Sequence, residues 1–263
     1  MQTFVINLAR RPDRMSAMTA QLDALRIPFT RIDAVDARDE FVPGIGTRIA
    51  PAGPLGPMAR GDACCSLSHI RVWETFVSTP GDRYALVLED DVTLYRDGPA
   101  LLAQFSNLPA DVDLLKLECY GNASRRILVG TQTPTSPEFQ IAPLHSKHTG
   151  SGAYLISRTL AARLLQDDRP WPFSIDQMLF NLDISPIAGV CRPYQLLPAV
   201  AAQTNLKTDS DIESWRVPFR ALNRVYLARE LRRAGISLGV LPRQILAVLS
   251  GQSHFVRVDL ASN

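Results

Sequence analysis

The chain has 263 residues, of which 46% are hydrophobic and 21% charged, and its formal net charge is +2. This composition supports a large buried core and one sizeable α/β domain with room for an appendage. The weak net charge gives no reason to expect nucleic acid as a partner. No apolar run reaches the roughly 18 residues that a membrane-spanning helix needs.

Cellular location is constrained by the N-terminus and the cysteines. The chain starts directly with a strand-like segment and lacks the basic and apolar regions of a signal peptide. Its four cysteines show no CxxC spacing, so we interpret them as reduced thiols. We therefore expect a cytoplasmic protein that is soluble or peripheral to the membrane.

The first elements predict the opening of a parallel sheet. Residues 3–8, "TFVINL", have the pattern of a buried strand, and residues 10–27 carry apolar residues at helical spacing after Pro12. Residues 28–37 form a second predicted strand that leaves Asp33 and Asp36 at its end. Strand, helix, strand in this order is typical of a parallel α/β sheet.

The following elements continue the α/β pattern. Residues 39–60 are rich in glycine and proline and predict a loop. Further predicted elements are a helix over 61–78, a strand over 83–92, a helix over 97–108, a strand over 111–120 that carries Glu118, a hairpin region over 125–145, a turn, strand and helix over 148–166, a short helix over 174–182 and an extended segment over 189–203.

The character of the chain changes at Ser214. Residues 214–263 contain eight arginines and two acidic residues, a net charge of +6. The arginines alternate with apolar residues at helical spacing. We therefore expect a catalytic domain over 1–213 and a basic helical extension over 214–263. Such an extension fits either a peripheral contact with an anionic membrane or an ordinary packed helical pair with a solvated basic face.

Three consecutive carboxylates, Glu89, Asp90 and Asp91, follow the apolar strand residues directly. Like charges repel, and the edge of a buried strand is a costly place for them. In open α/β sheets ligands bind beyond the carboxyl ends of strands, and carboxylate oxygens suit Mg²⁺ or Mn²⁺. Strand alternation puts Glu89 and Asp91 on one face. The alternative is a solvated acidic turn, which the apolar Val92 and Leu94 disfavour.

Several segments in order resemble glycosyltransferase family 25. They include "FVINLARRPDRM", "IDAVDA", "SLSHIRVWE", "LEDDV", "HTGSGAYLISRTLAARLL", "SIDQML" and "LLPAVAAQ", and the resemblance spans roughly residues 3–205. It implies a GT-A-like fold with a mostly parallel Rossmann-type sheet flanked by helices. It also implies inverting transfer of a sugar, usually galactose from UDP-galactose, to a hydroxyl of a lipopolysaccharide or other surface glycan, with Mn²⁺ or Mg²⁺ as cofactor.

The resemblance also suggests roles for individual residues. Asp91 is expected to bind the metal, Glu89 the metal or the donor ribose, and Asp90 the donor sugar. The base is Asp176 or Glu118, with Asp176 favoured by the resemblance. No histidine lies between His148 and His254 to serve as a further metal ligand, so Gln203 or water is expected there. Expected donor-binding residues are Asn7, Arg11, Arg14, Asp33, Asp36, Ser68, His69, His148, Gly150 and Gly152.

Each of these residues also has an ordinary structural role that the sequence leaves open. Arg11 and Arg14 could lie at a solvated helix start, and Asp176 could be satisfied by backbone N–H groups at its helix. Gly150 and Gly152 could simply form a tight turn.

Two other classes of function use the same residues. A nucleotidyltransferase or phosphohydrolase would use the acidic cluster in the same way, although the chain has no Gly-rich P-loop. A non-catalytic nucleotide-sugar-binding protein would keep the pocket without turnover.

Overall fold

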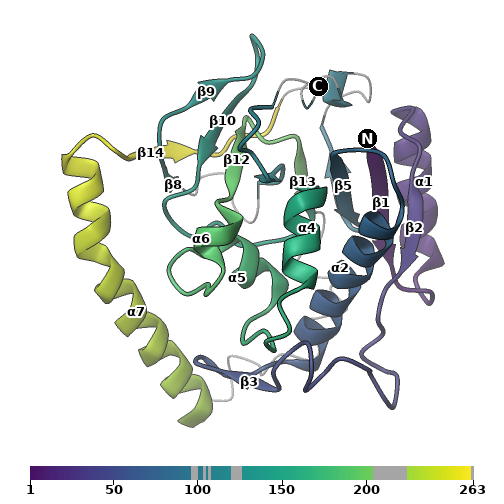
Figure 1. The fold of residues 1–263 in the computed structure, drawn as a ribbon, viewed down its shortest axis with the longest axis horizontal. Coiled ribbons are helices and arrows are strands. Elements are labelled where there is room, and N and C mark those ends of the chain that lie inside the picture. Colours follow the sequence, from purple (N-terminus) through teal and green to yellow (C-terminus); the bar gives the residue numbers. More distant parts are fainter. Residues whose placement is uncertain (96–99, 103–104, 106–107, 120–125, 204–223, 262–263) are drawn as a thin grey trace.

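The computed structural model describes residues 1–95, 100–102, 105, 108–119, 126–203 and 224–261. Its centre is an eight-stranded sheet in the order β2-β1-β5-β11-β7-β12-β10-β9, with helices packed around it (Figure 1). The α/β class expected from the sequence is therefore confirmed. The strands are β1 (Gln2–Asn7), β2 (Thr30–Asp33), β5 (Tyr84–Glu89), β7 (Leu114–Lys116), β9 (Thr133–Pro134), β10 (Gln140–Pro143), β11 (Ala153–Ser157) and β12 (Tyr194–Leu197).

The sheet is mixed, but most of its strands point the same way. β1 pairs in parallel with both β2 and β5, and β7 pairs in parallel with β12. Strands β11 and β10 run antiparallel to both of their neighbours. The other six central strands therefore share one direction, and the carboxyl ends of β1, β2 and β5 meet at one edge, where ligands bind in sheets of this type.

Alternating residues of the strands fill two cores, one on each face of the sheet. On β1, Phe4 and Ile6 belong to one core and Val5 to the other. The first core is covered by α2 (Arg60–Ser78), α4 (Arg158–Leu165), α5 (Ile175–Phe180) and α6 (Ala188–Cys191). The second is covered by α1 (Pro12–Ala24), which buries Met18 and Leu22.

Three small strand pairs complete the described structure. β6 (Val92–Leu94) pairs with β13 (Ala201–Gln203), and β3 (Ala52–Gly53) pairs with β4 (Gly56–Pro57) inside the predicted loop. In the third pair, β8 (Arg126–Val129) binds β14 (His254–Arg257) near the C-terminus. The β6–β13 pair matters for the site because its register sets Gln203 opposite Val92, next to the acidic triplet.

The C-terminal part of the chain contains one long helix, α7 (Arg224–Leu249), which precedes β14. The expected boundary between 213 and 214 lies outside the described residues, as do parts of the predicted helix over 97–108. Within the residues described, none of the helices combines the length and the apolar character needed to cross a membrane.

Candidate active site

A cleft opens where the carboxyl ends of β1 and β5 face helix α2. It encloses about 660 Å³ of space, part of it open to solvent. Charged groups come from both sides: Arg10 and Arg14 from the segment after β1, and the carboxylates from the end of β5. The α2 side contributes Cys65, Ser68 and His69. The acidic triplet therefore borders a pocket, as a ligand site requires.

The three carboxylates do not share the same partners. The Nε2 atom of Gln203 lies 3.1 Å from Glu89 Oε2 and 3.4 Å from Asp91 Oδ1. Asp90 also lines the cleft but has other partners: it accepts a 2.6 Å hydrogen bond from Asn7 Nδ2 and a 3.1 Å bond from Arg14 Nη1. Glu89 and Asp91 thus share a partner that Asp90 lacks among the described residues, although β5 ends at Glu89 and the two aspartates lie in the following turn.

The charge of the triplet is only partly balanced. Burial, together with the charge of Glu89, raises the pKa of Asp91 to about 8, although Arg14 Nη1 lies 3.6 Å from its Oδ2 atom. A carboxyl group with such a raised pKa is one that a bound cation would stabilise in its ionised form. The donor set of Glu89, Asp91 and the side-chain oxygen of Gln203 suits Mg²⁺ or Mn²⁺, once the Gln203 amide turns its oxygen inward.

A chain of hydrogen bonds leads from the core to Glu89. Trp73 Nε1 lies 3.1 Å from the Tyr154 hydroxyl, which lies 2.9 Å from His69 Nδ1. The Tyr154 hydroxyl accepts from the indole N–H. Because the ionised Glu89 on the other side of the His69 ring can only accept, the Tyr154 hydroxyl is assigned as the donor to Nδ1.

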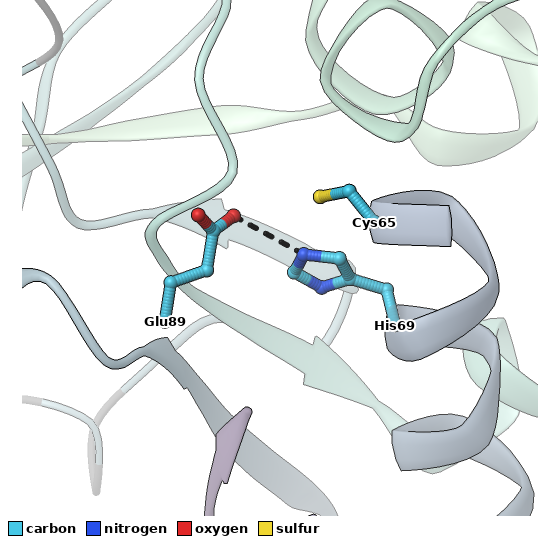
Figure 2. A group of neighbouring side chains, drawn as sticks. All are labelled: Cys65, His69 and Glu89. Carbon is cyan, nitrogen blue, oxygen red and sulfur yellow. Dashed lines mark hydrogen bonds and ion pairs between the residues drawn. The ribbon is translucent and has the colours of Figure 1, made fainter. Parts of the chain in front are cut away.

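The proton of His69 is consequently on Nε2, which donates to Glu89 Oε1 at 3.2 Å (Figure 2). Burial alone would raise the pKa of Glu89, but the bonds from His69 and Ser151 outweigh it, and the pKa is lowered. His69 therefore holds Glu89 ionised and oriented.

Cys65 lies one helical turn before His69, and its thiol points toward Glu89 (Figure 2). The ligand atoms of Cys65, His69 and Glu89 all lie within 4.8 Å of one another. Burial raises the pKa of the Cys65 thiol well above its usual value, so it is protonated at neutral pH. A protonated thiol is a poor ligand for Mg²⁺ or Mn²⁺, which leaves Cys65 as a wall of the cleft. The sequence analysis did not single it out, although its i, i+4 spacing from His69 was a readable signal.

A second polar cluster lies at the end of β7 and is sealed from solvent. Lys116 Nζ donates to Glu118 Oε1 and to the Gly150 carbonyl, both at 2.5 Å. Both side chains are fully buried. Burial lowers the pKa of Lys116 and raises that of Glu118, and their mutual attraction opposes both shifts. Lys116 was missed from the sequence, where a lysine two residues before Glu118 in an apolar strand was the available signal.

The segment Gly150–Ser151–Gly152 binds three of the predicted carboxylates in succession. The Gly150 N–H donates to Asp176 Oδ2 at 3.4 Å, the Ser151 hydroxyl to Glu89 Oε1 at 2.8 Å, and the Gly152 N–H to Glu118 Oε1 at 3.0 Å. Three residues far apart in the sequence are thereby gathered on one short loop before β11.

The two glycines of this loop have different structural roles. Gly150 has φ +96°, where a side chain would be strained. A Cβ atom on Gly152 would lie 2.9 Å from both Glu118 Oε2 and Gln203 Cγ, so only glycine fits. Glu118 Oε2 is buried and has no hydrogen-bond partner among the described residues. This orphaned oxygen, next to Gln203, is a further sign that the site is built to hold a positive group.

Asp176 stands at the start of α5 and is half-buried. Its Oδ1 atom accepts from the Ser174 hydroxyl at 2.6 Å, and its Oδ2 atom accepts from Gln177 Nε2 at 3.1 Å. These bonds hold the carboxylate in place while leaving it partly accessible, in contrast to the sealed Glu118.

Other predicted donor-binding residues are distributed less tightly. Arg14, Ser68 and His69 line the cleft, and Asp36 pairs with Arg10 at 2.7 Å. Asn7 is buried beneath Asp90 and positions it. The structure does not bring Arg11, Asp33 or His148 into the cleft lining: Arg11 pairs with Asp13, Asp33 with Arg31, and His148 with Gln195. Arg10 faces the cleft, but the sequence analysis did not name it.

Comparison with known proteins identifies the family of the chain. The family model described as glycosyltransferase family 25 (LPS biosynthesis protein) matches residues 1–179, more than half of the chain. The chain belongs to glycosyltransferase family 25, as the resemblance predicted. It is accordingly a protein of the sugar-transferring class.

The sequence identity to individual relatives is low or is confined to part of the chain. The chain is 25% identical over 213 residues to the lacto-N-neotetraose biosynthesis glycosyltransferase LgtE of Neisseria meningitidis serogroup B, covering 77% of this chain and 74% of LgtE. It is 37% identical over 99 residues to the inactive glycosyltransferase 25 family member 3 of Homo sapiens, covering 35% of this chain but 16% of that protein. A solved Drosophila β-1,4-galactosyltransferase 7 mutant in complex with manganese, UDP-Gal and xylobiose aligns over 87% of this chain and 79% of its own, with 12% identity and a TM-score of 0.34.

Proposed function

We propose that this protein transfers a sugar, most simply galactose from UDP-galactose, to a hydroxyl of a lipopolysaccharide or other surface glycan, with inversion at the anomeric carbon and with a divalent cation. The observation that carries the proposal is the Gly150–Gly152 loop, which binds Asp176, Glu89 and Glu118 and so connects them to the open cleft that Glu89 lines. Family membership supports the class of reaction, and the relative LgtE is named for lacto-N-neotetraose biosynthesis.

The donor would occupy the cleft with its diphosphate near the acidic triplet. Glu89, Asp91 and Gln203 would hold Mn²⁺ or Mg²⁺, which when bound would offset the negative charge of the leaving diphosphate. Arg14 and Arg10 offer guanidinium groups to phosphate oxygens at the same wall. Asn7 keeps Asp90 turned toward this side, where it would accept from a donor hydroxyl.

Asp176 is the better choice for the general base. Direct displacement with inversion needs a carboxylate that accepts the proton of the acceptor hydroxyl, within hydrogen-bond reach of it. Asp176 is half-buried and held by Ser174 and Gly150, whereas Glu118 has no exposed surface and is paired with Lys116. Glu118 would then act on the shape and charge of the loop rather than on the acceptor.

The donor assignment is tested by thermal shift with UDP and with ATP, each with and without Mn²⁺. We expect stabilisation by UDP that depends on Mn²⁺, and none by ATP, since binding to the folded state alone raises the melting temperature. Stabilisation by ATP alone would support the nucleotidyltransferase or phosphohydrolase alternative. No shift with either would contradict the proposed site. In the absence of an acceptor the enzyme should hydrolyse its donor slowly. Among UDP-sugars, UDP-galactose should be hydrolysed fastest.

The base is tested by Asp176→Asn, with the exposed Asp168→Asn as a matched control. The Asp176 variant should keep Mn²⁺-dependent UDP binding and lose roughly 10²-fold or more in transfer rate, the scale of a lost general base. The control should transfer at the wild-type rate. Wild-type turnover in Asp176→Asn would remove Asp176 from the mechanism.

We further propose that residues 1–213 form the catalytic domain and 214–263 an extension, and that the protein works on the cytoplasmic side of the membrane. A glycan acceptor carried on a lipid would be presented there. Because β14 pairs with β8 and Val258 is buried in the core, cleavage near residue 213 should leave the two pieces associated, and a cleaved protein that keeps UDP binding would support the division.

A further inference from the structure

The outward face of α7 is a continuous apolar stripe. Large hydrophobic side chains recur along it at intervals of three, four or seven residues, which places them on one side of the helix. Eight of the eleven exposed large hydrophobic residues found among the described residues belong to α7. Their exposed fractions range from 36% to 80%. The stripe proper consists of Leu227, Leu231, Leu238, Leu241, Ile245 and Leu249.

The opposite side of α7 faces the rest of the protein through polar contacts. Arg232 Nη1 donates to the Pro54 carbonyl at 3.2 Å, and Gln244 Nε2 donates to Asp183 Oδ1 at 3.3 Å. The helix runs along the outer edge of the molecule (Figure 1). Apolar surface of this extent that is exposed to solvent usually marks a contact with another molecule or a membrane.

The charge of α7 favours an anionic partner. Among its residues with described side chains, Arg229, Arg232, Arg233 and Arg243 stand against a single acid, Glu230. Arg232 and Arg243 are exposed on the side of α7 away from the stripe, where their charge adds to the positive potential around the helix. A second copy of the chain would bring two basic helices together, whereas anionic lipid headgroups would complement their charge.

We infer that α7 lies on an anionic membrane surface, with the apolar stripe in the interface and the arginines behind it, from where their charge attracts the anionic headgroups. An amphipathic basic helix binds a bilayer in this way, with an affinity that grows with the buried apolar area and with the anionic charge. The inference goes beyond sugar transfer, because binding to lipid needs neither donor nor metal.

The position of α7 connects this surface to the proposed active site. A groove with about 1020 Å³ of space, part of it open, separates α7 from the body and is lined by Arg233, Ser237, Thr149 and Gln177. Thr149 precedes Gly150 and Gln177 follows Asp176 in the chain. The residue that follows the proposed base in the chain therefore lines a groove beside α7.

The test is co-sedimentation of the full chain with vesicles of 30% phosphatidylglycerol and 70% phosphatidylcholine, and with pure phosphatidylcholine. The wild type should bind the anionic vesicles, more weakly as salt is raised, and the pure phosphatidylcholine vesicles much less. The double variant Leu238→Glu with Ile245→Glu should bind at least about tenfold more weakly, because it charges the centre of the stripe. The matched control is Phe41→Glu, an exposed hydrophobic side chain outside α7, which should bind as the wild type does.

Two results would overturn the inference. One is binding by the stripe variant equal to that of the wild type, or no binding by the wild type. The other is a concentration-dependent wild-type dimer in analytical ultracentrifugation that Leu238→Glu dissociates, since the stripe would then be a self-association surface. Mn²⁺-dependent stabilisation by UDP is measured on the same preparations. It confirms that each variant is folded and separates a failure of membrane binding from a failure of the proposed function. If the double variant does not fold, Leu231→Ser, exposed by 64%, takes its place.

Discussion

Polar clusters lie at the ends of two strands of the same sheet, β5 and β7, and they are built in opposite ways. At β5, Glu89 and Asp91 face a cleft with a partial counter-charge from Arg14. Beyond β7, Glu118 is fully buried against Lys116. Both contact the loop that precedes β11. Acidic residues after a buried strand are therefore not equivalent. An open cluster whose charge is only partly balanced can take up a cation, whereas a buried ion pair shapes the loop that lies between the two clusters.

Removing one partner of the sealed pair should have the largest effect on stability. Lys116→Met leaves Glu118 buried without its counter-charge, which costs about 3–5 kcal/mol. Adding Glu118→Leu should recover much of the loss, because no charge is then buried alone. Urea denaturation of the two variants measures both steps. As a control, Arg31→Gln at the exposed pair with Asp33 should change the free energy of unfolding by less than about 1 kcal/mol. If the single and double variants lost the same free energy of unfolding, Lys116 would not be the counter-charge of Glu118.

The open cluster should reveal itself through pH. Since the pKa of Asp91 is raised from 3.8 to about 8 on folding, the folded state holds a proton that the unfolded state has released. The stability contributed by this group is complete below pH 3.8 and is lost as the pH rises to about 8.

Asp91→Asn cannot ionise, so its advantage over the metal-free wild type should grow up to about pH 8. The gain is a few kcal/mol at most, since one pKa unit corresponds to about 1.4 kcal/mol. Melting temperatures from pH 5 to 8.5 measure the gap between the two proteins. Mn²⁺ with UDP should stabilise the wild type but not the variant. If the difference in melting temperature between the two proteins did not depend on pH, the pKa of Asp91 would not be raised on folding.

The loop between the two clusters should tolerate no side chain at Gly152. Gly152→Ala pushes a methyl group against Glu118 and Gln203, and overpacking of this kind costs about 1–3 kcal/mol. Mn²⁺-dependent UDP binding should weaken as well, because Gln203 is displaced. Gly189→Ala is the control, since its added methyl group would meet nothing within 4 Å. If both substitutions leave calorimetric melting and UDP binding unchanged, the close approach at Gly152 is incorrect.

The smallest expected effect comes from the hydrogen-bond chain behind Glu89. Tyr154→Phe leaves the Trp73 N–H and His69 Nδ1 without their partner, at a cost of roughly 1–2 kcal/mol. Because the His69 proton is then no longer confined to Nε2, affinity for Mn²⁺ should fall several-fold. Isothermal titration with Mn²⁺ in the presence of UDP separates this loss from the change in melting temperature. Unchanged metal affinity would limit Tyr154 to a packing role.

Much of the site could be located from the sequence, because it depended on local patterns. The apolar run into Glu89–Asp91 and the small residues around Gly150 mark strand ends and close backbone approaches without knowledge of the fold. Lys116, Cys65 and Arg10 were not found in this way. Each has an ordinary local explanation, and each acquires its role only from neighbours that lie far away in the chain.

The C-terminal extension is a second case in which the sequence left the packing open. Its sequence indicated a basic helix with apolar residues, but either face could have packed on the body. Contacts from Arg232 and Gln244 decide that the polar side faces inward and leave the leucine stripe exposed.

The amino-acid sequence by itself determined the family, the α/β class and the presence of an acidic strand end, because periodicity and motif order are local properties of the chain. Only the tertiary structure decided which carboxylates are open and which are sealed. That distinction depends on burial and on counter-charges, which come from strands, loops and helices brought together by folding.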